Sequence, residues 1–135
     1  MFKLRLVTPT KKIVDELEVS EVFVPAYRGE IDILPGHAPL VTTLSTGILK
    51  YREKDAANLH SFAVSWGYCE VHADGVTILA DTAEAPSEID PARAKEAYSK
   101  AEKEIGTAAV SEATMTKYQN KLKRAEVRLA VSQLK

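Results

Sequence analysis

The sequence predicts a β-rich module followed by a pair of helices. Apolar residues alternate at period two from the first residue to about Thr82, the pattern of half-buried antiparallel strands. Beyond that point β-branched residues give way to alanine, glutamate and lysine, which are good helix formers. A chain of 135 residues can hold both parts and still bury a stable core. We therefore expect two modules, residues 1–86 and 87–135, joined by a hinge near residues 83–87.

The first module consists of short apolar runs separated by turn residues. The positions expected to face its core are Phe2, Leu4, Leu6, Leu17, Val19, Val22, Val24, Phe62, Val64, Trp66, Val76, Ile78 and Ala80. Turn signals lie at Thr8-Pro9, Arg28-Gly29 and Asp74-Gly75, and the last pair suits a two-residue hairpin turn with positive φ. Many short strands at this spacing indicate a small sandwich or flattened barrel.

The second module carries helix start and stop signals. Asp90 followed by Pro91 fits an N-cap and a first helical position, because the aspartate oxygen accepts a free backbone N–H and proline lacks one. Gly106 is the expected end of this helix. Two apolar stripes recur at spacings of three and four: Ala94, Tyr98, Ala101, Ile105 and Ala108, then Met115, Tyr118, Leu122, Ala125 and Leu129. They predict a two-helix hairpin of modest stability, because the shared apolar surface is small.

Composition and motifs exclude several classes of function. The single cysteine, Cys69, rules out an internal disulfide and a thiolate zinc cage, and no apolar stretch approaches the roughly 18 residues of a membrane span. The three histidines show no ligand spacing, so no metal site is expected. Phosphate-loop, serine-hydrolase and zinc-protease motifs do not occur, and no catalytic residue is assigned. The first residues alternate like a strand, so we expect no signal peptide and a cytoplasmic location.

The charge is distributed unevenly along the chain. Residues 1–87 hold 8 basic and 12 acidic side chains, whereas residues 88–135 hold 10 basic and 7 acidic ones. The basic cluster at 121–129, KLKRAEVRL, alternates with the apolar face of a helix and lacks aromatic residues. We therefore expect a solvated helix face and no nucleic-acid binding.

The segment GEIDILPGHAPL at residues 29–40 predicts an exposed corner. Its alternating run ends at two prolines, Pro35 and Pro39, which cannot donate to a sheet ladder, and Gly36 permits a tight turn. His37 should therefore lie on an exposed loop, where partners commonly bind. The residues alone predict an interaction module with a mobile basic helical hairpin.

The whole chain resembles the epsilon subunits of F-type proton-translocating ATP synthases, which are called delta in mitochondria. The resemblance rests on VTPTKKIV near the start, GEIDILPGHAPLVTTLSTGIL at 29–49, AVSWGYCEV at 63–71, VTILADTAE at 76–84, and the two helices that follow. It implies a ten-stranded N-terminal β-sandwich followed by a C-terminal antiparallel two-helix hairpin.

The resemblance also implies a function. Members of this family are non-catalytic rotor subunits of the central stalk, peripheral at the cytoplasmic face of the cell inner membrane. The sandwich would bind the gamma subunit and rest on the c-ring, with Glu30, Asp32 and His37 as ring contacts; acidic groups suit a ring whose loops are basic. The alternative is that this block only builds the turn. The hairpin would lie folded, or extend into the alpha/beta catalytic head and oppose ATP hydrolysis.

A second motif implies ATP as a regulatory ligand, although no cofactor is required. Residues 89–94, IDPARA, are similar to the I/L-D-x-x-R-A signature of ATP-binding epsilon subunits, from which Pro91 departs. The implied nucleotide-binding residues are Glu84, Ile89, Asp90, Arg93, Ala94, Arg124 and Arg128. Arginines four apart share a helix face and can hold phosphate oxygens, and the bound nucleotide would stabilise the folded hairpin. The alternative is that Asp90 is only an N-cap and Arg93 only a first-turn residue.

Two other classes of function compete with the rotor subunit. A free-standing ATP-sensing protein would use the same nucleotide residues but leave the loops of the sandwich without a partner. A small enzyme would need a polar constellation that the sequence does not supply. Recovery of a gamma subunit with the tagged chain separates these alternatives.

Overall fold

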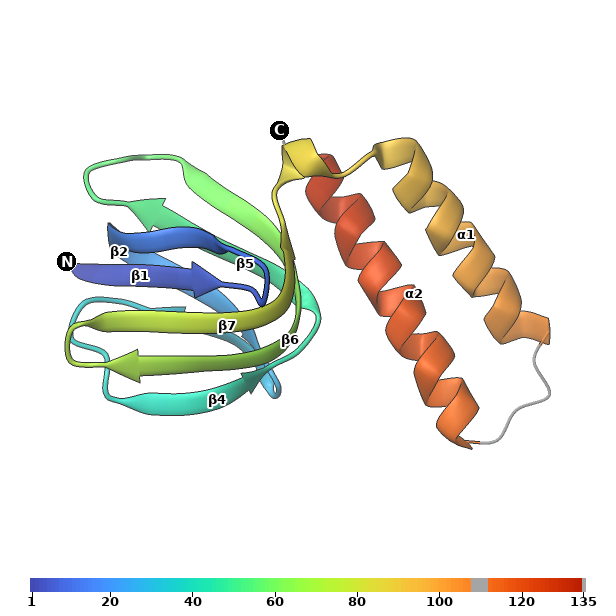
Figure 1. Cartoon of the computed structure of the whole chain (residues 1–135), viewed down its shortest axis with the longest axis horizontal. Coiled ribbons are helices and arrows are strands. Elements are labelled where there is room, and N and C mark those ends of the chain that lie inside the picture. Colours follow the sequence, from blue (N-terminus) through green and yellow to red (C-terminus); the bar gives the residue numbers. More distant parts are fainter. Residues whose placement is uncertain (108–111, 135) are drawn as a thin grey trace. The chain divides into compact units, whose positions relative to one another are not determined.

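Residues 1–107 and 112–134 are described by the structure, a computed structural model, and they form two units. The units are Met1–Ala83 and Glu84–Lys135 (Figure 1). None of the helices in these residues combines the length and the apolarity that crossing a bilayer requires.

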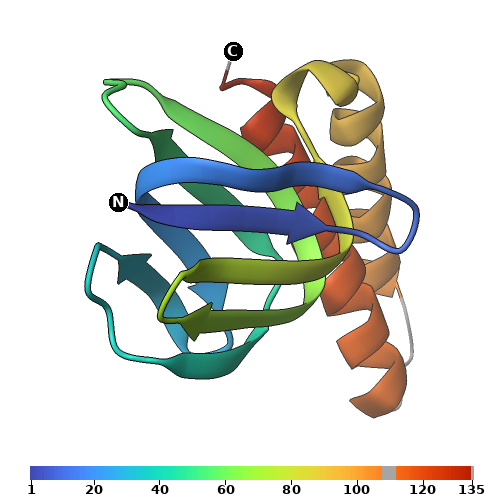
Figure 2. The same ribbon diagram turned by 60° about the vertical axis from the view of Figure 1, so that its left-hand side comes forward.

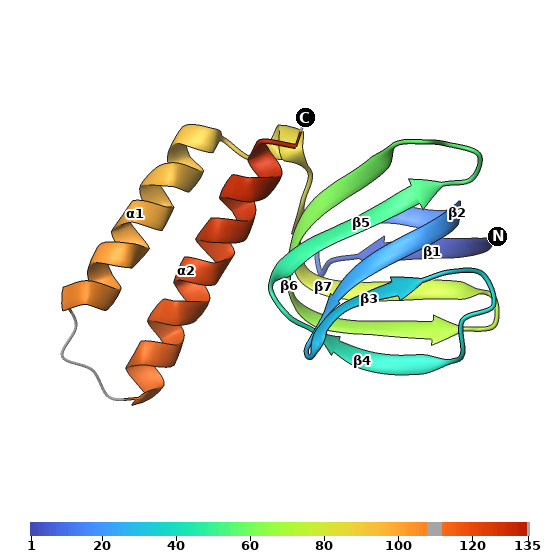
Figure 3. The ribbon, with the colours of Figure 1, turned by 180° about the vertical axis from the view of Figure 1, so that it is seen from behind.

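The first unit is a β-sandwich. Its strands are β1 (Phe2–Val7), β2 (Lys12–Ala26), β3 (Gly29–Ile33), β4 (Leu40–Leu44), β5 (Gly47–Glu53), β6 (Leu59–His72) and β7 (Gly75–Glu84). They pair in the order β1-β7-β6-β4-β2-β3, and β5 pairs with both β2 and β6 (Figures 1 and 3). β1 runs antiparallel to β2 and parallel to β7, which lie on either side of it (Figure 2). The predicted β-sandwich class is confirmed.

The core consists of the inward residues of these strands. The predicted positions that are buried are Leu4, Leu6, Val19, Val22, Val24, Phe62, Val64, Val76, Ile78 and Ala80. Ile33, Leu49, Cys69 and Val71 are buried with them. Side chains alternate strictly between the two faces of the short strands, so the period-two pattern of apolar residues predicted most of this core.

The described residues contain seven continuous strands where the family resemblance implied ten, and part of the difference arises because two long strands, β2 and β6, bend without ending. β2 pairs with β1 through its first half and with β3 and β5 through its second half. A positive φ of 49° at Glu16 accompanies a register shift in the pairing with β1, and the pairing with β5 shifts register between Val19 and Glu21, where β2 changes partners. β6 pairs first with β5 and then with β4, and the bend lies at Trp66 and Gly67, with φ of 52° and 132°.

The prediction that Trp66 faces the core is wrong. Before the bend β6 buries every residue of 62–65, whereas after it only the alternate residues Cys69 and Val71 are buried. The irregular backbone at residues 66–67 separates these two patterns, and Trp66 lies outside, 47% exposed.

The prediction of positive φ at Asp74-Gly75 is also wrong. The hairpin between β6 and β7 does turn at Ala73 and Asp74, but none of the described residues with positive φ lies in this turn. Gly75 meets a different demand: a Cβ at this position would overlap the carbonyl oxygen of Lys3 on the parallel neighbour β1. The glycine is needed for close approach of two backbones.

The second unit contains a short 3-10 turn, η1 (Pro86–Glu88), and two helices that pack side by side, α1 (Pro91–Thr107) and α2 (Glu112–Ser132) (Figure 1). Asp90 is the predicted N-cap, because its Oδ1 accepts the N–H groups of Ala92 at 2.9 Å and Arg93 at 3.4 Å. The helix continues one residue beyond Gly106.

The packing of the helices follows the predicted stripes in part. Ala94, Ala101 and Ala125 are buried, while Ala108 lies outside the described residues. Val127 and Val131 are buried as well and were not predicted. The single apolar stripe did not include them, because α2 contacts η1 as well as α1 and so buries more than one face of the helix.

Candidate functional site

The predicted nucleotide residues of the second unit include a bidentate ion pair. Arg128 donates from Nε to Glu84 Oε1 at 2.8 Å and from Nη2 to Oε2 at 3.2 Å. The two side chains are only 29% and 25% exposed, so this pair is better shielded from water than an ordinary surface ion pair. The sequence predicted both residues as ligand contacts, but in the structure they bind each other.

A cavity of about 300 Å³ lies between α1 and α2. Its lining residues are Ala97, Lys100, Ala101, Glu104, Lys121, Arg124, Ala125 and Arg128. Four of them are basic and one is acidic, and Lys121 approaches Glu104 to 3.5 Å. The small alanines leave the space and the long basic side chains line it, so the cavity suits an anionic group.

Sequence reasoning found Arg124 and Arg128 of this cavity but missed Lys100 and Lys121. A usable signal exists for Lys121, which lies three residues before Arg124 and four before the buried Ala125 on the same helix, whereas no such spacing marks Lys100. The lysines were missed because exposed lysines on a helix are usually solvated.

The IDPARA segment occupies the start of α1. Ile89 and Ala94 are buried, and the Asp90 carboxylate already accepts backbone N–H groups as the N-cap. The Arg93 side chain is exposed, and among the described residues neither Asp90 nor Arg93 lines the cavity. The structure therefore groups Glu84, Arg124 and Arg128, and leaves the IDPARA pair at the helix start.

The predicted ring contacts lie on β3 and on the turn that follows it. Glu30 and Asp32 face outward on β3, opposite Pro25 and Phe23 of β2. Burial, followed by hydrogen bonding and charge repulsion from the Asp32 carboxylate, raises the pKa of Glu21, whereas Arg52 opposes this shift. Asp32 therefore interacts with Glu21 on the neighbouring strand β2, and it lies within β3, before the turn that carries His37.

His37 is held by the turn itself. Its backbone N–H donates to the Leu34 carbonyl at 3.1 Å, and its ring Nδ1 lies 2.6 Å from the Ala38 carbonyl oxygen. A carbonyl oxygen only accepts, so this contact requires the proton on Nδ1. The positive φ of 86° at Gly36 builds the predicted tight turn.

Metal and thiol chemistry find no support in the described residues. No group of three or more histidine, cysteine, aspartate or glutamate side chains in residues 1–107 and 112–134 could hold a metal ion. Burial raises the pKa of the Cys69 thiol to about 12, which keeps it protonated and unreactive.

Both parts of the chain match family models. Residues 1–86 match the β-sandwich domain of the ATP synthase delta/epsilon chain, and residues 87–133 match its long alpha-helix domain. The chain is 41% identical over 131 residues to the ATP synthase epsilon chain of Bdellovibrio bacteriovorus, covering 97% of this chain and 94% of the relative. It is 44% identical over 130 residues to that of Geobacter sp. strain M21, covering 96% and 92%.

Solved structures share the fold. A chain in the cryo-EM structure of Euglena gracilis mitochondrial ATP synthase, covering OSCP, F1 and the c-ring, is similar with a TM-score of 0.83 and 22% identity, over 99% of this chain and 81% of that one. A chain of the Tetrahymena thermophila mitochondrial ATP synthase central stalk and c-ring gives a TM-score of 0.56 and 18% identity, over 99% and 96%. With both family models and full-length relatives matched, the chain belongs to the ATP synthase delta/epsilon chain family.

Proposed function

We propose that this chain is the epsilon subunit of a rotary proton-translocating ATP synthase and a non-catalytic part of its central stalk. The match of both modules to the delta/epsilon chain, over almost the full length of its relatives, is the observation that carries this function. The subunit couples rotation to ATP synthesis by holding other rotor parts together. It is peripheral at the cytoplasmic face of the inner membrane through the complex.

The proposed partners are the gamma subunit and the c-ring, contacted by the sandwich. Affinity purification of the tagged full chain from detergent-solubilised membranes of its own organism tests them. We expect gamma in a one-to-one ratio, with c subunits retained in mild detergent. A chain that purifies alone, yet binds ATP, would favour the free-standing ATP-sensing protein.

The c-ring contact is assigned to Glu30, Asp32 and His37. Two outward acidic side chains on β3 and a histidine on the next turn give a polar border that suits basic ring loops. We expect the triple alanine variant to lower proton-driven ATP synthesis while ATP hydrolysis by the soluble catalytic sector remains unchanged.

A matched control uses the same three residue types elsewhere on the sandwich. Glu53, Asp55 and His60 lie at the end of β5, in the following turn and at the start of β6. Their triple alanine variant should leave synthesis unchanged. Equal synthesis in both triple variants would contradict the ring contact and leave His37 as a turn residue.

The hairpin is proposed to be regulatory, opposing ATP hydrolysis when it extends into the alpha/beta head, with ATP stabilising the folded form. The basic cavity between α1 and α2 supports this proposal, because it places Arg124 and Arg128 beside two lysines. A nucleotide would have to share Arg128 with Glu84 or displace it. A ligand shifts an equilibrium only by its differential affinity, so ATP must favour the hairpin in which the cavity exists.

Calorimetry of the full chain with millimolar ATP tests the ligand. Loss of one charge-assisted contact costs roughly 1.5–3 kcal/mol, so Arg124→Ala should weaken ATP binding about tenfold to hundredfold. Lys117→Ala, on the same helix but outside the cavity lining, should leave the affinity within about twofold. Absence of heat with the unaltered chain would reject the nucleotide, and equal losses in both variants would reject the cavity.

A further inference from the structure

The cavity between α1 and α2 carries an excess of positive charge. Its described lining residues include four basic side chains and one carboxylate, that of Glu104. Lys121 approaches this carboxylate to 3.5 Å. Lys100 and Arg124 form no ion pair with any residue in 1–107 or 112–134. The cavity therefore gathers cations that the described part of the chain does not neutralise.

The spacing of the basic residues on α2 makes this excess unfavourable without a ligand. Lys121 lies three residues before Arg124, and Arg128 lies four residues after it. Side chains at these spacings share one face of a helix, where like charges repel each other. An anion bound between them would replace the repulsion by attraction, and it would stabilise the packing of α2 against α1.

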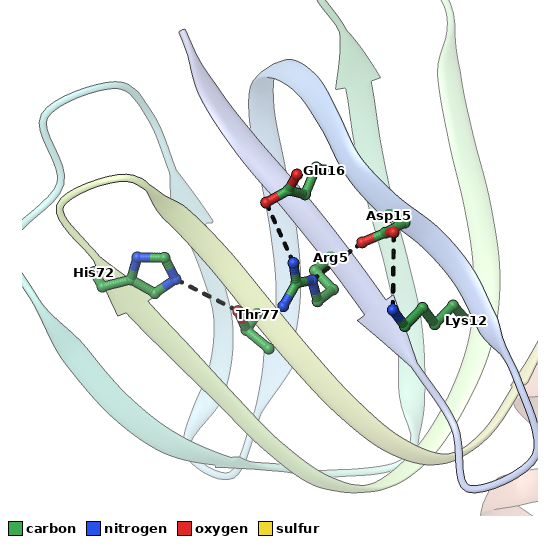
Figure 4. Close-up of polar contacts among 6 residues, drawn as sticks. All are labelled: Arg5, Lys12, Asp15, Glu16, His72 and Thr77. Atoms are coloured by element: carbon green, nitrogen blue, oxygen red, sulfur yellow. Dashed lines mark hydrogen bonds and ion pairs between the residues drawn. The ribbon is translucent and has the colours of Figure 1, made fainter.

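The charges around another cavity, of about 190 Å³ on the sandwich, are balanced by comparison. Figure 4 shows the ion pairs beside it. Arg5 on β1 donates to Asp15 at 3.2 Å and to Glu16 at 3.3 Å, and Lys12 lies 4.0 Å from Asp15. Because carboxylates of β2 neutralise these cations, this region offers an anion little net attraction. The excess in the second unit is a property of its cavity and not of charged surfaces in general.

Arg128 already holds an oxyanion in the structure. Its Nε and Nη2 donate to the two carboxylate oxygens of Glu84, at 2.8 and 3.2 Å. A phosphate group presents pairs of oxygens that the same planar guanidinium binds bidentately. The Glu84 carboxylate therefore uses the donors that a phosphate would need, and it acts as a competitor within the chain.

The lining offers little that distinguishes one nucleobase from another. Of the eight described lining residues, three are alanines and five are charged, so none is aromatic and none carries an amide or a hydroxyl group. Hydrogen bonds to the edges of a base are what identify it. An arginine can stack on a base, but such stacking is tolerant because every base has a π-face. The lining suits phosphate oxygens and leaves the base unread.

The size of the cavity agrees with a compact ligand group. Its volume of about 300 Å³ lies at the lower end of the range of about 300–1,000 Å³ for small-molecule pockets. Asp90 is engaged as the N-cap of α1, and neither Asp90 nor Arg93 is among the described lining residues. The space therefore suits a phosphate chain, with the remainder of a nucleotide outside it.

We propose that this cavity recognises the phosphate chain of its ligand and not the base, so that any nucleoside triphosphate, or inorganic triphosphate, binds by displacing Glu84 from Arg128. This inference rests on the proposed function, in which ATP stabilises the folded hairpin. It adds that the hairpin responds to polyphosphate in general. The affinity is set by competition, because Arg128 must release one oxyanion before it binds another.

Calorimetry of the unaltered full chain tests the selectivity, at fixed ionic strength and without divalent cations. ATP, GTP and CTP should bind within about threefold of one another, and inorganic triphosphate should bind as tightly. Inorganic diphosphate should bind about tenfold more weakly, because it makes fewer charge-assisted contacts. A preference of more than about tenfold for ATP over GTP or inorganic triphosphate would overturn the proposal.

A pair of lysine variants on α1 tests the location. Lys100→Ala should weaken ATP and inorganic triphosphate by the same factor, about tenfold, since this lysine would contact phosphate in both. Lys95→Ala is the matched control, because Lys95 is exposed on the same helix and is not among the described lining residues. It should bind both ligands within about twofold of the unaltered chain. Equal losses in the two variants would overturn the assignment to this cavity.

Glu84→Gln tests the competition. Removing the carboxylate charge frees Arg128, so inorganic triphosphate should bind at least about threefold more tightly. The melting temperature, measured with and without inorganic triphosphate, shows whether the variant is folded, and the ligand should raise it more than in the unaltered chain. Weaker binding by a folded Glu84→Gln chain would make Glu84 a ligand contact and overturn the competition. The comparison of ligands on the unaltered chain does not depend on this variant.

Failure of the proposed ATP regulation gives a different result from failure of this inference. If the unaltered chain gives no heat with any of the ligands, both are wrong. If ATP binds and inorganic triphosphate does not, only the recognition of the phosphate chain is wrong. Recovery of the gamma subunit tests the rotor assignment independently of both.

Discussion

The bidentate pair of Glu84 and Arg128 should stabilise the second unit more than the ion pair of Lys121 and Glu104 does. The pair joins the end of β7 to α2 through two charge-assisted hydrogen bonds. A double-mutant cycle with Glu84→Gln and Arg128→Gln isolates their interaction, because each change removes one of the two charges and the cycle subtracts the effect of each single change.

The expected magnitude follows from the exposure of the pair. Fully exposed ion pairs contribute about 0–1 kcal/mol, and hydrogen bonds to charged groups about 1.5–3 kcal/mol. With both side chains roughly a quarter exposed, the coupling should lie between these ranges, at about 1–2 kcal/mol. The contact between Lys121 and Glu104, at 3.5 Å with the lysine 57% exposed, should give about 0.5 kcal/mol or less.

Hydrogen exchange of the α2 amides measures both couplings, since it reports the free energy of opening that helix. At about 1.4 kcal/mol the cycle would change the opening constant about tenfold. The coupling should also shrink only slightly between low and moderate salt, because the pair is shielded. Equal couplings for the two ion pairs, or a coupling below about 0.3 kcal/mol for Glu84 and Arg128, would refute the reasoning.

Four further predictions concern the sandwich. Gly67→Ala should destabilise the sandwich by about 3 kcal/mol or more, because the new Cβ overlaps the backbone of β7 and φ is 132°. Gly36→Ala, where φ is 86° but the space is open, should cost only about 1 kcal/mol. Urea denaturation measures both changes in the free energy of unfolding. Thr46→Val should raise stability by about 1 kcal/mol, since the buried hydroxyl finds no hydrogen-bond partner among the described residues. Native Cys69, with its thiol pKa raised to about 12, should resist alkylation at pH 8 and react only after unfolding. Folding raises the pKa of Glu21 above its ordinary value of 4.5, so its ionised carboxyl destabilises the fold at neutral pH. Glu21→Gln should therefore stabilise at pH 7, and this gain should fade as the pH falls through the raised folded pKa and be gone below 4.5.

Local pattern predicted most of the sandwich, and the failures have a common physical cause. Alternation locates the core where a strand is regular, as at Leu4 and Leu6 or Val76 and Ile78. It fails at Trp66, because the positive φ at Trp66 and Gly67 interrupts the alternation of side chains along β6. The sequence carries no sign of that bend, so the exposure of Trp66 could not be predicted.

In the candidate site of the second unit, too, the sequence predicted the local features and missed a tertiary contact. The N-cap role of Asp90 follows from local chemistry, and the structure places Arg124 and Arg128 on one cavity as their spacing suggests. The pairing of Arg128 with Glu84 joins residues 44 apart in the chain. A contact of that separation depends on tertiary packing, which period and spacing do not encode.

The bends of β2 and β6 have a mechanical consequence. Each of these strands pairs with different neighbours in its two halves, so one covalent backbone passes through both regions of the sheet. A shearing load between those regions must therefore stretch or twist a continuous chain, in addition to breaking hydrogen bonds between strands. With β2 and β6 running unbroken through both regions, the sandwich is stiffer against torsion than it would be if each of these strands were two short ones joined by a loop, so it deforms little under load.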